Sequence, residues 1–139
     1  MEWRVVLDTM VWVSAALNEK GAPGAIVRLA SAREIRLITS RWIHDEVVAT
    51  FPEVARYWSR ETEPREWLAA AESFADVVDD IEGPPLTVDP KDAPILWAVY
   101  AGGATHVVTK DAALLAEKHY REAQILTPPD FLRTWRSAR

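Results

Sequence analysis

The sequence contains no cysteine and only three histidines in 139 residues. These absences exclude disulfide scaffolds, thiol catalysis, and zinc or iron–sulfur centres held by cysteine. No segment approaches the run of about 18 apolar residues that a membrane helix needs. The start of the chain also lacks the charged segment and long apolar run of a secretory signal. We therefore expect a cytoplasmic protein with no membrane partner.

The balance of charges is acidic, with 16 Lys and Arg against 21 Asp and Glu, a net charge of −5. This balance disfavours a domain that is held on DNA or on an anionic membrane by bulk charge. It leaves open an enzyme that meets nucleic acid through bound metal ions. Hydrophobic residues make up 49% of the chain, and no repeat or long linker divides it. We therefore expect one globular domain over residues 1–139.

Short apolar runs alternate with helical patterns along the chain. The expected strands are residues 4–7, 35–39, 86–88, 105–109 and 124–127. Helices are expected over residues 10–17, 24–33, 64–81, 92–102 and 112–119, from Ser40 to about Pro52, and after Pro128-Pro129. Strands that alternate with helices indicate βαβ units. The sequence therefore predicts an α/β fold, an α/β/α sandwich with a central, mainly parallel sheet of four to five strands.

Four acids are placed where such a sheet gathers its functional groups, beyond the carboxyl ends of the strands. Asp8 directly follows the first expected strand, and Asp111 follows the strand at 105–109 by one residue. Asp92 opens the helix after the strand at 86–88. Glu46 lies on the second turn of the helix that begins after Ser40, where Asp45 is the alternative inward acid. All four can meet at one edge of the sheet.

Carboxylates brought this close repel one another unless a cation binds between them. Oxygen ligands without Cys or His select Mg²⁺ or Mn²⁺, and four carboxylates balance two divalent ions. One or two such ions would activate water for attack on a phosphodiester. The simpler interpretation is that Asp92 and Asp111 cap helices and that Glu46 is a solvated helix residue. Asp8 fits that interpretation least, because it closes a buried strand.

Several motifs resemble those of the PIN-domain ribonuclease family, in order along essentially the whole chain. They are the opening Val-Val-Leu-Asp-Thr at 5–9, the helix carrying Glu46, Lys-Asp-Ala-Pro-Ile-Leu at 91–96 and Val-Val-Thr-Lys-Asp at 107–111. The closing Ile-Leu-Thr-Pro-Pro-Asp-Phe-Leu at 125–132 is similar to the end of the branch that serves as toxins of prokaryotic toxin–antitoxin pairs.

The resemblance implies a compact domain that cleaves RNA with Mg²⁺ or Mn²⁺. Carried over by position, its acidic quartet and metal ligands are Asp8, Glu46, Asp92 and Asp111. Thr9 and Thr109 match positions where the family often has a hydroxyl that supports the site. Met10 departs from the family's common Asn or Ser and removes a polar group there. A homodimer and an antitoxin partner are also implied.

Other features carry less information. Lys110 stands beside Asp111 and either contacts a substrate phosphate or is an ordinary exposed lysine. His44, His106 and His119 share no spacing, and we assign them no catalysis. Seven tryptophans are most simply packing residues, with base stacking as the alternative. The tail at 133–139 carries three arginines, and the sequence leaves open whether they contact RNA.

Two alternative functions remain open at this point. A receiver-like signalling domain also collects acids, a Thr and a Lys at strand ends around Mg²⁺, but usually has two adjacent acids after its first strand. Here Asp8 stands alone. The other alternative is a catalytically inactive PIN-like binding module, for which Met10 is the only sign.

Overall fold

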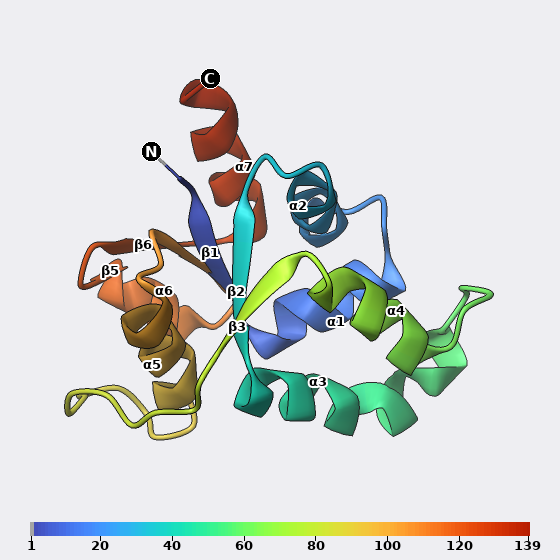
Figure 1. The fold of residues 1–139 in the computed structure, drawn as a ribbon, viewed down its shortest axis with the longest axis horizontal. Coiled ribbons are helices and arrows are strands. Elements are labelled where there is room, and N and C mark those ends of the chain that lie inside the picture. Colours follow the sequence, from blue (N-terminus) through green and yellow to red (C-terminus); the bar gives the residue numbers. More distant parts are fainter. Residues whose placement is uncertain (1) are drawn as a thin grey trace.

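The apolar run at residues 4–7 forms a central strand of a six-stranded sheet in the computed structural model, which describes residues 2–139 (Figure 1). The strands are β1 (Arg4–Leu7), β2 (Arg36–Ser40), β3 (Ala75–Val78), β4 (His106–Val108), β5 (His119–Tyr120) and β6 (Ala123–Leu126). Their order across the sheet is β3-β2-β1-β4-β6-β5, and all neighbours are parallel except β5 and β6. The predicted mainly parallel sheet is confirmed, with six strands in place of four to five.

Seven helices cover the sheet. They are α1 (Thr9–Leu17), α2 (Ala22–Ser31), α3 (Arg41–Val54), α4 (Pro64–Glu72), α5 (Ala93–Gly102), α6 (Ala112–Glu117) and α7 (Pro128–Ser137), and a 3₁₀ turn covers Ala55–Tyr57. Figure 1 shows α5 and α6 on one side of the sheet and α1, α2 and α4 on the other. The structure is therefore the predicted α/β/α sandwich. Over residues 2–139, no helix is long and apolar enough to cross a membrane.

The core lies between the sheet and its two helical layers. The central strands are almost wholly apolar, and Val5, Val6 and Leu7 have no solvent exposure. Continuous burial of this kind is typical of a parallel strand covered on both faces. Trp12 and Trp135 are buried in the core, and Trp42 and Trp67 pack partly against the core, as the packing interpretation predicts.

The predicted helix over residues 64–81 is wrong beyond Glu72, because the chain turns there into the edge strand β3. The apolar spacing of Phe74, Val77 and Val78 fits a helix equally well, so the pattern alone misleads. Asp76 favours the strand, because its carboxylate accepts a hydrogen bond from Nε of Arg36 on β2 at 2.9 Å. This contact with Arg36 also lowers the pKa of Asp76.

The predicted strand at residues 86–88 is also wrong, because those residues lie in the loop between β3 and α5. The third strand along the chain is instead β3, at Ala75–Val78. The predicted helix over 112–119 ends at Glu117, and His119 begins the short strand β5. Pro52 does not end its helix, since α3 continues to Val54.

The order of the strands fixes where a site can form. The chain runs from β1 outward to β3, crosses the sheet through α5, and re-enters as β4 on the other side of β1. The carboxyl ends of β1 and β4 therefore form a topological switch point, where helices leave toward opposite faces. Open parallel sheets place their functional crevices at such points.

Candidate active site

Asp8 and Thr109 follow the two strands that meet at the switch point. Leu7 pairs with Val108 in register, and the N–H of Asp8 donates to the carbonyl of Val108 at 2.9 Å. The hydroxyl of Thr109 then donates to Oδ2 of Asp8 at 2.7 Å. Thr109 has no solvent exposure, and its hydroxyl fixes the partly buried Asp8 carboxylate.

Asp111 is joined to the same hydroxyl. Its backbone N–H donates to Oγ1 of Thr109 at 3.0 Å, so one hydroxyl links the loop of Asp111 to the carboxylate of Asp8. Oδ1 of Asp111 accepts hydrogen bonds from the N–H groups of Ala113 and Leu114, which caps α6. The capping interpretation is therefore correct for Asp111, but the capping hydrogen bonds use only one of its two carboxylate oxygens.

Asp8 caps α1 in a similar way, with Oδ1 accepting from the N–H of Thr9 at 2.7 Å. Thr9 thus supports the Asp8 carboxylate through its backbone. Met10, the departure from the family pattern, lies on the same first turn and is 51% exposed. Its side chain is therefore directed to solvent.

Asp92 behaves differently from the other two acids. It stands at the N-cap position of α5 but makes no side-chain capping hydrogen bond, and it is only 6% exposed. Within residues 2–139, no hydrogen-bond donor reaches its buried Oδ2. Burial raises the pKa of Asp92 above its usual range, and the negative charges of Asp111 and Asp8 raise it further against the opposing positive charge of Lys91. The capping interpretation therefore fails for Asp92.

Three of the four predicted acids, Asp8, Asp92 and Asp111, thus lie close enough that the charges of Asp8 and Asp111 act on Asp92. Glu46 is exposed on the second turn of α3, and it is not among the acids that raise the pKa of Asp92. Its neighbour Asp45 is bound to Arg41 at 3.0 Å, on the solvent side of the helix. The helix that carries Glu46 packs against both α1 and α5, which begin at Asp8 and Asp92.

Lys110 stands at the rim of the three-acid cluster. Its Nζ donates to Oγ of Ser14 on α1 at 2.7 Å, although the side chain is exposed. This bond holds the ammonium group against the second turn of α1, six residues after Asp8. No histidine shares this region: His44 contacts Glu72, His106 stacks on Trp3, and His119 is exposed on β5.

Two further acids near the site were not singled out from the sequence. Asp89 lies in the loop before α5 and adds to the negative charge around Asp92. Asp80 follows β3, and its carboxylate accepts a hydrogen bond from the N–H of Trp42 at the start of α3, at 3.1 Å. Because the sequence predicts a helix over residues 64–81, Asp80 does not stand out as an acid that follows a strand. That position after a strand is the signal that identifies Asp8.

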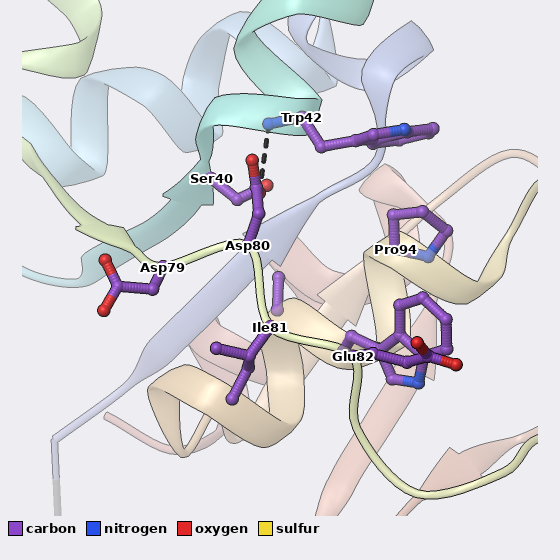
Figure 2. A pocket seen from close by; sticks show the side chains of 9 residues that line it. Ser40, Trp42, Asp79, Asp80, Ile81, Glu82 and Pro94 are labelled. Carbon is purple, nitrogen blue, oxygen red and sulfur yellow. Dashed lines mark hydrogen bonds between the residues drawn. The ribbon is translucent and has the colours of Figure 1, made fainter.

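A pocket of about 180 Å³ opens beside the hydrogen bond between Trp42 and Asp80, over the ends of β2 and β3. Figure 2 shows Asp80 directed toward the backbone of Trp42, with Pro94 of α5 facing the same space and Asp79 directed away. Pro94, two residues after Asp92, lines this pocket, but none of the three acids does.

The donor chemistry of the cluster fits a hard divalent cation. It consists of carboxylates without Cys or His, and the buried Oδ2 of Asp92 has no protein partner. As the side chains stand, however, no group of three or more His, Cys, Asp or Glu in the described chain is arranged to hold an ion.

Comparison with known proteins identifies the family of this chain. The family model described as PIN domain matches residues 4–113, which include β1, β4 and the three clustered acids. Neither the curated proteins nor the solved structures yield a significant match. The family match favours a nuclease-type fold over the receiver-like alternative. The match spans well over half of the sequence, and the chain belongs to the PIN-domain family.

Proposed function

We propose that this chain is an endoribonuclease that depends on Mg²⁺ or Mn²⁺, with Asp8, Asp92 and Asp111 as ligands and Glu46 as the fourth. The observation that carries the proposal is the orphaned Oδ2 of Asp92, which is buried among like charges. A buried carboxylate without a partner is costly, and a divalent cation offsets both the burial and the repulsion. One or two ions fit the charge of this set.

The chain's own residues prepare the cluster for a cation. Thr109 holds the Asp8 carboxylate, and Asp111 keeps one oxygen that does not cap α6. Asp8, Asp92 and Asp111 would hold the ion. Glu46 reaches the same ion from α3, which packs against both helices that start at the cluster.

When bound, the ions would supply Lewis-acid activation of water and neutralise charge at the phosphate. Lys110 is positioned to contact a phosphate oxygen of the substrate, with Ser14 orienting its ammonium group. In-line attack of water on phosphorus breaks the P–O3′ bond and leaves a 5′-phosphate and a 3′-hydroxyl. This chemistry requires no histidine base, in agreement with the positions of the three histidines.

The test is cleavage of labelled single-stranded and structured RNAs by the purified protein in Mg²⁺, Mn²⁺ or EDTA. We expect cleavage with either ion, 5′-phosphate products, and loss of cleavage in Asp8→Asn with the fold retained. Glu117→Gln, which removes one charge at the far end of α6, is the matched control and should cleave normally. Intact RNA under every metal condition would contradict the proposal, and RNA that is bound but uncut would favour the inactive binding module.

We propose further that the protein is a cytoplasmic toxin of a toxin–antitoxin pair and acts as a homodimer. The support is the resemblance of residues 125–132 to that branch, together with exposed apolar side chains available for protein contacts, Val77 among them. Arrest of growth on expression, relieved by a protein encoded nearby, is the expected result. A monomeric mass in light scattering would contradict the dimer.

A further inference from the structure

A basic groove lies between α2 and α7, on the helical layer that includes α1. Its volume is about 370 Å³, and its charged lining consists of Lys20, Arg28, Arg133 and Arg136. The buried Leu132 forms part of its floor, where α7 packs against α2. The groove is thus a packed junction of two helices with exposed cations along its rim.

The charge of the basic groove contrasts with that of the chain. It holds four of the 16 Lys and Arg residues of a protein whose net charge is −5, and no acid lines it. The two acids nearest in sequence are already paired. Glu19 binds Arg60 at 3.4 Å, and Asp130 binds Arg133. The remaining cations of the groove therefore face solvent without acidic partners among its lining residues.

The fold connects the basic groove to the three-acid cluster. The helix α7 begins just after β6, whose last residue Leu126 accepts a hydrogen bond from the N–H of Thr109 at 3.0 Å. The helix α1 begins after Asp8 and leads toward Lys20, and its nine residues span about 13 Å. The groove thus lies about one short helix away from the acids, within reach of a continuous RNA strand.

We infer that the basic groove binds the sugar–phosphate backbone of the RNA substrate, beyond the nucleotides held at the three-acid cluster. Arginine and lysine side chains that bind phosphates supply affinity and register without reading sequence. The carboxylates offer phosphates no positive charge of their own, and the basic groove supplies such charge for the rest of the strand. Two of the three C-terminal arginines that the sequence left unassigned, Arg133 and Arg136, then have a function in α7.

Because this inference rests on the proposed ribonuclease function, its test separates binding from cleavage. Anisotropy of a fluorescein-labelled single-stranded RNA of about 16 nucleotides measures binding by the full chain in EDTA, over a range of salt concentrations. The test variant is Arg28→Gln with Arg136→Gln. The matched control is Arg33→Gln with Lys118→Gln, which removes the same charge from exposed positions outside the groove.

Loss of two phosphate contacts should weaken binding about tenfold and lower the slope of log K against log salt by about 1.4, since each contact contributes about 0.7 for single strands. The control should match the wild type. Equal losses in both variants, or none in either, would overturn the inference. So would a groove variant that loses binding of a poly-glutamate peptide but keeps RNA binding, because the groove would then serve an acidic protein.

Cleavage of the same RNA in Mn²⁺ is measured in parallel. Weakened RNA binding in the groove variant, together with a wild type that does not cleave, would support RNA binding by the groove and contradict the nuclease function. Cleavage by the wild type with unchanged binding in both variants would support the nuclease function and contradict RNA binding by the groove.

Discussion

The buried hydroxyl of Thr109 donates to the carboxylate of Asp8 at 2.7 Å, across the boundary between β4 and β1. The same oxygen accepts the backbone N–H of Asp111 at 3.0 Å. One side chain thus sets the positions of two acids that come from different strands. A contact of this kind orients a metal ligand without touching the ion.

Thr109→Val keeps the side-chain shape and removes both hydrogen bonds. We expect cleavage to fall by about 10-fold to 100-fold, the usual effect of removing a group that orients a metal ligand. Stability should fall by about 1–3 kcal/mol, because the N–H of Asp111 loses its buried acceptor. Thr109→Ser keeps the hydroxyl and should retain most of the activity. Equal activity of the Val and Ser variants would show that the hydroxyl does not orient Asp8.

Asp92→Asn should stabilise the protein in the absence of divalent cations. The folded-state pKa of Asp92 is raised, so the folded protein binds its proton more tightly than the unfolded chain does. Stability therefore falls as pH rises from the unfolded pKa through the folded one, and at neutral pH the charged Asp92 is unfavourable. We expect a gain of about 1 kcal/mol, or about 4 °C in Tm, in EDTA at pH 7.

The wild type should show a decrease of stability across the titration of Asp92 that the Asn variant lacks. Thermal unfolding of both proteins from acid to neutral pH measures the difference. A variant that is less stable than the wild type at pH 7 in EDTA would mean that Asp92 has a protein partner that stabilises its charge.

Glu46→Gln tests the one predicted ligand that the structure leaves outside the cluster. If Glu46 reaches the ion during catalysis, cleavage should fall by at least about 100-fold, comparable to the loss of other transition-state contacts. Asp45→Asn is the matched control, because Asp45 is adjacent and bound to Arg41 on the exposed face. Glu46→Gln with wild-type kinetics, or a larger loss in Asp45→Asn, would remove Glu46 from the site.

His106 should make the protein sensitive to acid. Burial lowers its pKa, and its ring stacks on Trp3 with the centroids 4.3 Å apart. The unfolded chain then binds the proton more tightly than the folded protein, so stability is lost as pH falls through the unfolded pKa of about 6.5. His106→Phe keeps an aromatic ring and should flatten the dependence between about pH 7 and 5. Exposed His119→Gln should leave the dependence unchanged.

The elements that position the site follow from local sequence signals. The apolar residues Val5 to Leu7 predict β1, and Ser40 predicts the start of α3, where its hydroxyl accepts the N–H of Ile43 at 3.2 Å. Gly103 ends α5 in the left-handed region at φ 59°, as the Gly102-Gly103 pair predicts. These signals depend on neighbours in the chain, which is why sequence alone is sufficient for them.

The edge of the sheet depends on contacts that are distant in the chain. Residues 75–78 form a strand because they pair with β2, where Asp76 also meets Arg36, a partner 40 residues away, and no local pattern reveals that pairing. The same limit applies within the site. Sequence places Asp92 and Asp111 equally well as caps, and only the fold shows that Asp111 caps its helix while Asp92 remains buried without a partner.

The most direct test of the metal site is a Mn²⁺ titration of the wild type and Asp92→Asn, followed by calorimetry at constant pH in the absence of RNA. The account predicts that the wild type binds one or two ions and that the variant binds at least about tenfold more weakly, because the buried Oδ2 of Asp92 is a ligand. Equal Mn²⁺ affinity in the two proteins, or no binding by a folded wild type, would contradict it.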